Sequence, residues 1–439
     1  MRRRRALGAI LAILSVLVES RMVQAAVADG DPNAAGWYEQ AAAQFHAPTD
    51  AVRQEMEQVL GGAWQGEHPA LEDHLRDNVE AIKSFERGAA LDQCDFFHDR
   101  LPDQVTTLRQ VTTPLESPYP YPNPNLAWVA HTVLLRAQRL ASQGRMADAM
   151  EDVLRVLRLA HHLGQEPHPT VFGKLLQVIF EHTADPVLEG WIVRGTLDTP
   201  SARRGLDGLA ALRKTTTPLG VASETEHAIE CAMIRSELRQ RLSERRNADA
   251  VEADMFGEYD RLSAEYLPLL TEAANRNDLD AYTAKTEQLA QEAARIEQRS
   301  VLGGLVSKWL QPAAARKHEF SLLLVSGEFF HVNKSIVRWY VGRARQDLLM
   351  VALAIRAYAL DRGGWPATIE ELVPAYLDAV PADPFAPGQA VRYVHDAAAW
   401  RVYSFGPDRQ DQQGLEWWSR DESRASGDVV VKGPSRTAP

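Results

Sequence analysis

Apolar side chains recur at every third or fourth position along most of the chain, and this spacing predicts helices. The series Leu71, Leu75, Val79, Ile82 and Phe85 is one example. Such positions fall on one side of a helix, so each predicted helix has an apolar face to bury against a neighbour. The pattern therefore predicts a mainly α fold in which helices pack on one another.

The helical pattern divides the chain into regions of different character. Residues 37–195 have clear apolar faces and are predicted to form a helical domain. Residues 196–335 are rich in charges of both signs, which is typical of long helical hairpins with a solvated face. An apolar run over residues 318–361 also contains several charged side chains, so we expect one or two buried core helices there and no membrane span.

One pair of helices in the first region has a more specific pattern. It surrounds the turn SQGRM at residues 142–146. Ala137, Leu140, Gly144 and Ala149 resemble the small, large, turn and second small residues of a tetratricopeptide (TPR) hairpin. About three hairpins are needed for a stable solenoid. The sequence therefore favours one TPR-like pair within a larger helical domain over a peptide-binding array.

The pattern changes after the long apolar run. Gly363 can end the preceding helix in a left-handed conformation, and Pro366 prevents the helix from continuing. Thr368 is expected to cap a short helix over residues 369–373, with Glu371 as its capping-box partner. These features predict a separate C-terminal module.

Strand patterns follow within that module. Asp383-Pro384-Phe385 is predicted to be a turn that anchors an aromatic side chain. The segments VRYVHD and WRVYSF alternate apolar and polar residues, which predicts a β-hairpin. The expected C-terminal part is thus a small α+β unit.

The N-terminus has the pattern of a targeting signal. MRRRR is followed by an apolar run of 13 residues, and small residues that suit a cleavage site follow at positions 23–25 and 26–28. We therefore expect residues 1–25 to be a signal peptide, with export from a bacterial cytoplasm to the periplasm or cell envelope and no stable membrane span after cleavage. The alternative is an uncleaved anchor, but the run is shorter than the roughly 20 residues of a span.

The balance of charges excludes some classes of binding partner, and the two cysteines leave the question of a disulfide bond open. Acidic residues outnumber basic ones by 59 to 48, which argues against nucleic acid or an anionic membrane as the main partner. Cys94 and Cys231 are the two cysteines of the chain. In an oxidising compartment they could form a disulfide bond, whereas buried free thiols are the other possibility.

The sequence lacks the common motifs of catalysis. It contains no His-Glu-x-x-His, Cys-x-x-Cys, Gly-x-Ser-x-Gly or phosphate-binding glycine loop. This favours a non-enzymatic protein. The alternative is an envelope hydrolase with a site in the helical domain that uses one of four histidines: His131, His161, His162 or His182.

Residues 336–434 resemble the globular part of the major pseudopilin of type II secretion. The likeness is carried by RARQDLLMVALAIRAYALDRGGWPATIEELV, YLDAVPADPF, VRYV, VYSFGPDRQDQQG and GDVVV. It implies a long helix, a Trp-Pro break, a short helix and a small antiparallel sheet. It also implies a calcium loop, to which we assign Asp408, Asp411, Asp421 and Asp428. Calcium prefers six to eight oxygen ligands, and a solvated loop without metal is the alternative.

A second likeness is carried by FERGAALDQCDF, by the hairpin LLRAQRLASQGRMADAMEDVLRVLRLAHHLG and by RARQDLLMVALAIRAYALDRGGWPATIEELVPAYLDAVPADPF. Through these stretches the whole chain resembles large bacterial envelope proteins that join a helical domain to such a module. We therefore expect an exported cell-envelope scaffold or protein-binding protein, with a protein partner in the envelope and a link to machinery like that of type II secretion. The alternative is the envelope hydrolase. A hydrolase requires a pocket with convergent polar groups and perturbed pKa values, whereas a scaffold is expected to have an exposed apolar patch.

Overall fold

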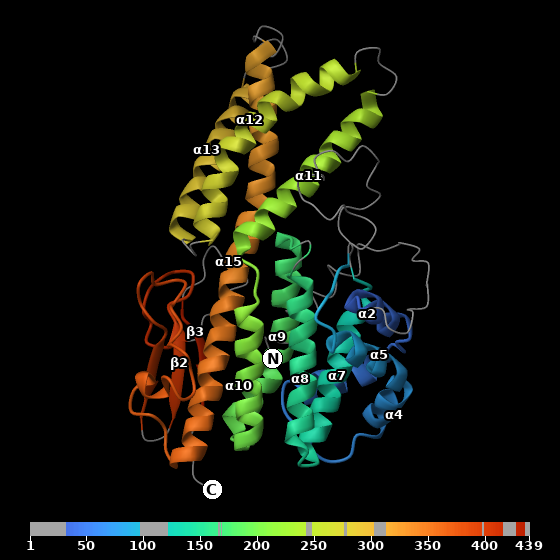
Figure 1. Ribbon diagram of the computed structural model, residues 1–439, viewed down its shortest axis with the longest axis vertical. Coiled ribbons are helices and arrows are strands. Elements are labelled where there is room, and N and C mark those ends of the chain that lie inside the picture. The colour runs from blue at the N-terminus through green and yellow to red at the C-terminus, as the bar shows by residue number, and fades with distance from the viewer. Residues whose placement is uncertain are drawn as a thin grey trace.

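The computed structural model confirms a mainly helical protein with a small antiparallel sheet near its C-terminus (Figure 1). It describes residues 32–96, 122–165, 167, 169–242, 248–275, 279–302, 313–396, 399–415 and 427–434. The expected signal peptide, residues 1–25, lies outside this part of the chain, and its cleavage stays a prediction. None of the described helices is long and apolar enough to cross a membrane.

Four short helices form the N-terminal layer: α2 (Ala34–Ala43), α3 (Asp50–Leu60), α4 (Pro69–Asp77) and α5 (Val79–Ala89). The last two were expected to be one helix with Val79 on its apolar face. The chain instead breaks at Asn78, whose side-chain amide donates hydrogen bonds to the carbonyl oxygens of His46 (3.1 Å) and His74 (3.0 Å). This break turns Val79 outward, where it is 41% exposed.

The expected helical pair consists of α7 (Asn125–Ser142) and α8 (Met146–Leu163). Gly144 has a φ of 75° in the turn between them, which explains the need for glycine there. Ala137 and Ala149 are both completely buried, as close approach of the two helices requires. The structure therefore confirms the helical hairpin, while its likeness to a tetratricopeptide repeat stays a prediction.

A single long helix organises the rest of the chain. This helix, α15 (Ala313–Arg362), has 50 residues and includes the apolar run that was expected to be one or two helices. It packs against α9 (Val171–Arg194) and α10 (Thr199–Lys214). The boundary expected at residue 336 lies inside α15, so the helical domain and the C-terminal module share one continuous helix.

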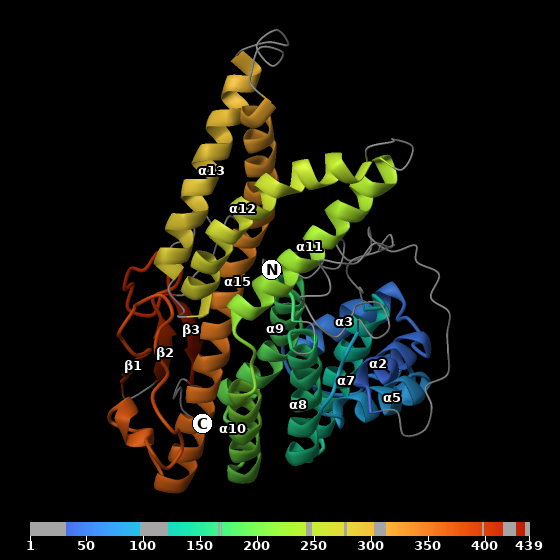
Figure 2. The ribbon, with the colours of Figure 1, turned by 45° about the horizontal axis from the view of Figure 1, so that its top comes forward.

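Three further helices extend beyond this body: α11 (Leu219–Leu242), α12 (Ala248–Asn275) and α13 (Leu279–Leu302). Figure 2 shows them projecting together with the first part of α15, and we call this unit the arm. The helices α12 and α13 pack on each other and on α15. Large aromatic side chains, including Tyr259, Tyr282 and Tyr340, are buried within the arm or at its base.

The C-terminal sheet covers another face of α15 (Figure 1). Its strands are β1 (Arg392–His395), β2 (Trp400–Ser404) and β3 (Val429–Lys432), which are antiparallel in the order β1-β2-β3. The register places Val402 opposite Tyr393 on one side and opposite Val431 on the other. The structure thus confirms the predicted β-hairpin and adds a third strand.

The turns before the sheet follow the predicted chemistry, with one exception. Gly363 has a φ of 76° at the end of α15. The short helix is the 3-10 helix η1 (Ile369–Leu372), but the side chain of Thr368 makes no capping hydrogen bond. The Glu371 carboxylate instead accepts a hydrogen bond from the Ala367 amide, at 3.0 Å.

Asp383 joins this turn region to the sheet. Its Oδ1 accepts hydrogen bonds from the Phe385 amide (2.9 Å) and the Ser404 hydroxyl (2.6 Å), and its Oδ2 accepts one from the Phe405 amide (2.9 Å). Phe385 is almost completely buried and contacts the ring of Tyr340 on α15. The aromatic anchor that was predicted at this turn is therefore confirmed.

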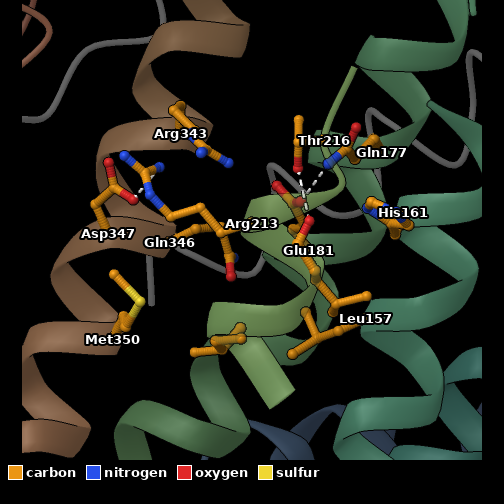
Figure 3. A pocket seen from close by; sticks show the side chains of 12 residues that line it. Leu157, His161, Gln177, Glu181, Arg213, Thr216, Arg343, Gln346, Asp347 and Met350 are labelled. Carbon is orange, nitrogen blue, oxygen red and sulfur yellow. Dashed lines mark hydrogen bonds and ion pairs between the residues drawn. The ribbon is translucent and has the colours of Figure 1, made fainter. Parts of the chain in front are cut away.

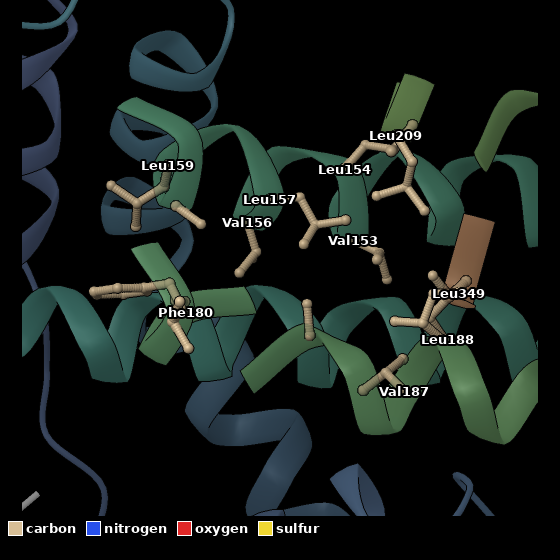
Figure 4. Close-up of a cluster of buried hydrophobic side chains, with 14 of the residues drawn as sticks. Val153, Leu154, Val156, Leu157, Leu159, Phe180, Val187, Leu188, Leu209 and Leu349 are labelled. Carbon is tan, nitrogen blue, oxygen red and sulfur yellow. The ribbon is translucent and has the colours of Figure 1, made fainter. Parts of the chain in front are cut away.

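The core is densest where α8, α9, α10 and α15 meet. Figure 4 shows Val153 and Leu157 of α8 facing Leu188 of α9, with Leu209 of α10 and Leu349 of α15 closing the cluster. Burying one such aliphatic side chain stabilises the fold by roughly 1.5–3 kcal/mol. This apolar cluster fixes the relative positions of the four helices that also surround the polar pocket described below.

The crossing of α15 and α9 yields the first prediction. A Cβ atom at Gly342 would lie 2.7 Å from Cγ2 of Val178, whose branched side chain cannot turn away freely. We expect Gly342→Ala to lower the free energy of unfolding by roughly 1–3 kcal/mol, as overpacked cores do. The measurement is the midpoint of urea-induced unfolding.

The matched control is Gly257→Ala in α12, where the added Cβ meets nothing within 4 Å. Alanine is the better helix former by about 1 kcal/mol, so the control should be slightly more stable than the wild type. Equal shifts for the two variants would show that α9 and α15 do not approach this closely.

Candidate functional site

The candidate site is a polar pocket between α8, α9, α10 and α15 (Figure 3). It encloses about 390 Å³ of empty space, part of which is open to solvent. Polar and apolar side chains both line it: Leu157, His161, Gln177, Glu181, Leu209, Leu212, Arg213, Thr216, Arg343, Gln346, Asp347 and Met350. We refer to these residues as the polar pocket.

Helical periodicity explains why these side chains converge. On α9, Gln177 and Glu181 are four residues apart, and on α15 Arg343 and Asp347 have the same spacing. Residues four apart lie on the same face of a helix. Each helix therefore contributes one short polar stretch to the pocket, while the apolar cluster beside it holds the helices together.

An ion pair closes one side of the pocket. Nη1 of Arg213 on α10 lies 2.5 Å from Oδ1 of Asp347 on α15. Burial raises the pKa of Asp347, whereas the charges of Arg343 and Arg213 act in the opposite direction. Because the Asp347 side chain is only 4% exposed, its carboxylate depends on these guanidinium groups.

Glu181 has the most unusual environment in the pocket. Burial, with a smaller effect of the neighbouring Asp185, raises the pKa of Glu181 to about 8, although a hydrogen bond from Gln177 opposes the shift. That bond runs from Gln177 Nε2 to Glu181 Oε1, at 2.8 Å. At neutral pH the Glu181 side chain is therefore an uncharged carboxylic acid that can donate a hydrogen bond.

His161 is also kept neutral by burial, which lowers the pKa of a basic group. Burial, followed by the positive charges near it, lowers the pKa of His161 to about 3. Its Nε2 lies 3.1 Å from the hydroxyl of Thr215, and its Nδ1 has no hydrogen-bond partner among the described residues. A histidine with so low a pKa is a weak base, so the pocket is better suited to hydrogen bonding than to proton abstraction.

Arg343 supplies a positive charge without a paired carboxylate. No hydrogen bond or ion pair joins it to the described residues; burial lowers its pKa, while the nearby carboxyl groups of Asp347 and Glu181 act in the opposite direction. Figure 3 shows its guanidinium pointing from α15 across the pocket toward the side where Gln177 and Glu181 lie. The arrangement can therefore hold a small polar ligand between a guanidinium and a neutral carboxylic acid.

The four histidines of the hydrolase alternative do not form one site. His161 is the one that lines the polar pocket. His131 is buried in α7, where its Nδ1 lies 2.7 Å from the Ala127 carbonyl, and His182 is exposed. His162 points the other way from α8, and its Nδ1 bonds to the hydroxyl of Tyr38 at 3.0 Å.

The charged members of the pocket, Glu181, Arg213, Arg343 and Asp347, were not found by the sequence analysis. Arg343 and Asp347 lie within the stretch YVGRARQDLLMVALAI, where charges interrupt an apolar helix. Charged residues on an otherwise buried helix require partners, so this interruption was the available signal. Such an interruption predicts a buried polar site on this helix, but it does not predict which other helices line that site.

The predicted calcium residues divide into two groups. Asp421 lies outside the described residues, whereas Asp408, Asp411 and Asp428 lie in the loop beside β2 and β3. Asp408 Oδ2 accepts hydrogen bonds from Gln412 Nε2 (2.8 Å) and the Gly427 amide (3.0 Å). Asp428 Oδ2 accepts one from the Gly414 amide at 2.6 Å.

These bonds bear on whether the loop fits calcium. Donors of the loop already occupy the carboxylate oxygens, and no group of three metal-binding side chains is found among the described residues. Burial, with the nearby charges of Asp411 and Asp408, raises the pKa of Asp428. The bonds that Asp408 and Asp428 already make argue against calcium, and the calcium site stays a prediction of the resemblance.

The two cysteines, Cys94 and Cys231, are free and buried in the structure. Cys231 Sγ lies 3.2 Å from the Tyr259 hydroxyl and 3.4 Å from Nε2 of His227. The structure therefore agrees with the alternative in which both cysteines are free thiols.

Comparison with known proteins gives no match to a protein family, to a curated protein or to a solved structure. The candidate site consequently depends on the geometry and charges described above.

The raised pKa of Glu181 predicts a dependence of stability on pH. The folded protein keeps a proton on Glu181 up to about pH 8, whereas an ordinary glutamate has a pKa of 4.5. The free energy of unfolding should therefore fall as pH rises from about 4.5 to 8. The contribution of Glu181 to this decrease in the free energy of unfolding is up to roughly 1.4 kcal/mol per pH unit, and it should be absent in Glu181→Gln.

Thermal unfolding of the wild type and the variant between pH 5 and 9 measures this difference. Glu80→Gln is the matched control, because that side chain is 70% exposed and pairs with Lys83 at the surface. If Glu181→Gln and Glu80→Gln have the same pH profile, Glu181 is not the neutral acid described here.

The loop hydrogen bonds give a prediction for calcium. Since loop donors occupy Asp408 and Asp428, we expect the same unfolding curve in millimolar calcium as in chelator. A bound ion would raise stability by about 2.7 kcal/mol at a hundredfold excess over its dissociation constant. A calcium-dependent shift that disappears in the double variant Asp408→Ala, Asp411→Ala would contradict this expectation and locate the ion.

Proposed function

We propose that the protein is an exported scaffold or protein-binding protein of the cell envelope. The observation that carries the proposal is the arm. Its helices project beyond the body and contact few other elements (Figure 2). A projecting set of long helices offers a large surface to a protein partner.

The exposed side chains of the arm fit a polar contact. Among the described residues of α12, Asp260, Glu265 and Glu272 are exposed, whereas Tyr259 and Leu262 face inward. The exposed large apolar side chains of the described chain are spread over separate segments and form no single patch: Val79, Val193, Leu269, Val394 and Leu415. The apolar patch expected of a scaffold is thus not found among the described side chains, and we propose that charge complementarity selects the partner instead.

The C-terminal module is the second part of the proposal. We propose that residues 336–434 are a pseudopilin-like docking piece that links the protein to machinery like that of type II secretion. The helix end at Gly363, the Asp383 turn and the three-stranded sheet on α15 support this likeness. The pattern of residues 1–25 supports export to the envelope.

An envelope hydrolase is the second candidate, and the polar pocket is the observation that favours it. A carboxylic acid with a pKa near 8, such as Glu181, can act as a general acid at neutral pH. Against this, His161 is too weakly basic to activate water. Glu181→Gln separates the two candidates, because a hydrolase would lose turnover whereas a scaffold would keep its partner.

Capture of partners from native envelope fractions tests the scaffold proposal. The bait is the mature protein, and its N-terminal sequence should begin between residues 26 and 29. We expect a reproducible partner whose recovery falls at least tenfold when the arm carries Glu265→Lys and Glu272→Lys, because both charge reversals lie on the exposed side of α12.

The matched control carries Asp77→Lys and Glu80→Lys, which reverse two exposed charges on the N-terminal layer. This control should keep the partner. Equal recovery with both variants would exclude the arm as the contact surface, and retention of Met1 in the mature protein would contradict export by signal cleavage.

A further inference from the structure

The charges lining the polar pocket do not balance. Arg213 and Asp347 form an ion pair. Glu181 is uncharged at neutral pH because burial raises its pKa to about 8. Arg343 then remains as a positive charge that has no hydrogen bond or ion pair with the described residues.

Two residues that line the pocket also have a buried polar atom without a partner among the described residues. Oε1 of Gln177 and Nδ1 of His161 are buried without hydrogen-bond partners among the described residues. Buried polar atoms of this kind are costly and are usually satisfied by water or by a ligand. Oε1 of Gln177 lies against Gly164 and turns away from Arg343, so the guanidinium of Arg343 and the carboxylic acid of Glu181 are the groups that face the partly open space (Figure 3).

We propose that the polar pocket binds a small oxyanion, a carboxylate or a phosphate group, on the guanidinium of Arg343. Guanidinium groups bind both anions through paired hydrogen bonds. The neutral carboxylic acid of Glu181 donates a further hydrogen bond to the anion. The pocket has about 390 Å³ of empty space that includes open solvent, so it suits a small ion or the end group of a larger molecule.

The position of the pocket supports this assignment. Asp185 and Glu189 of α9 bind Arg345, the arginine two residues after Arg343 on α15, at 3.0 Å and 2.6 Å. The body thus supplies carboxylate partners for Arg345 and Arg213, while Arg343 faces the open space. A ligand anion would complete the same pattern of paired charges.

All charged and titratable groups around the site determine how binding depends on pH. They are His161 and His162 on α8, Lys174, Glu181 and Asp185 on α9, Arg213 on α10, and Arg343 and Asp347 on α15. Of these, Glu181 changes its charge between pH 7 and 9. Since a charged Glu181 would repel the anion, affinity should fall as pH rises through about 8.

The experiment is a titration of the full mature protein with inorganic phosphate and, separately, with acetate, at constant ionic strength and pH 7. Binding is followed by calorimetry and by the shift of the melting temperature. We expect saturable binding of at least one anion, and at least tenfold weaker binding in Arg343→Gln. A preference for phosphate or for acetate identifies which oxyanion the pocket takes.

Two variants serve as controls. Arg362→Gln removes an exposed arginine from the end of the same helix and should bind as the wild type does. Arg343→Lys keeps the charge but not the paired donors, and should bind with intermediate affinity. Glu181→Gln should still bind the anion, but its affinity should no longer decrease between pH 7 and pH 9.

The proposal is overturned if neither anion binds, or if Arg343→Gln binds as tightly as Arg362→Gln. It is also overturned if the wild type binds equally well at pH 7 and pH 9. The anion titration does not involve the arm. If no anion binds, the proposed protein-binding function is unaffected. If partner capture fails, the proposed anion site is unaffected.

Discussion

A helix of 50 residues that carries apolar faces is stable in water only if other elements cover those faces. At about 1.5 Å per residue, α15 extends over roughly 75 Å. The body covers it with α9 and α10, the arm with α12 and α13, and the C-terminal sheet covers another face. The helices α9, α10, α12 and α13 and the C-terminal sheet are thus arranged around this helix, whereas the N-terminal layer packs on α7 and α8.

The same constraint creates the polar site. The buried half of α15 carries Arg343, Arg345 and Asp347 among apolar residues, and each charge must be compensated where the helix is covered. Compensation for Arg345 comes from α9, and for Asp347 from α10. Arg343 differs because it forms no ion pair with the described residues, although the carboxyl groups of Asp347 and Glu181 lie near enough to act on its charge. A site for a ligand can therefore arise from a charge that the fold leaves without a partner.

Much of the fold could be predicted from the sequence, because periodicity and turn chemistry are local. The α7–α8 hairpin, the helix end at Gly363, the Asp383 turn and the β1–β2 hairpin all follow from neighbouring residues. Local patterns failed at Asn78, where hydrogen bonds to the carbonyl oxygens of His46 and His74 break a helix that the apolar spacing would have continued.

The candidate site could not be predicted in the same way. Its charged residues come from α9, α10 and α15, and residues 181 and 343 meet only because tertiary packing brings distant helices together. Of the four histidines singled out by type, one lines the pocket, since residue type alone does not say which way a side chain faces. The environment of Glu181, and not its identity, gives it an unusual pKa.

The position of α15 in the chain has a consequence for folding. Arg345 bonds to Asp185, 160 residues earlier, so α9 and α10 are synthesised long before the helix that covers them. Contacts between such distant segments form slowly, and the apolar faces of α9 and α10 stay exposed until α15 packs on them. The body of this protein therefore cannot complete its core from the helices that precede the arm, and a nascent chain that stops before α15 presents an open, aggregation-prone helical surface.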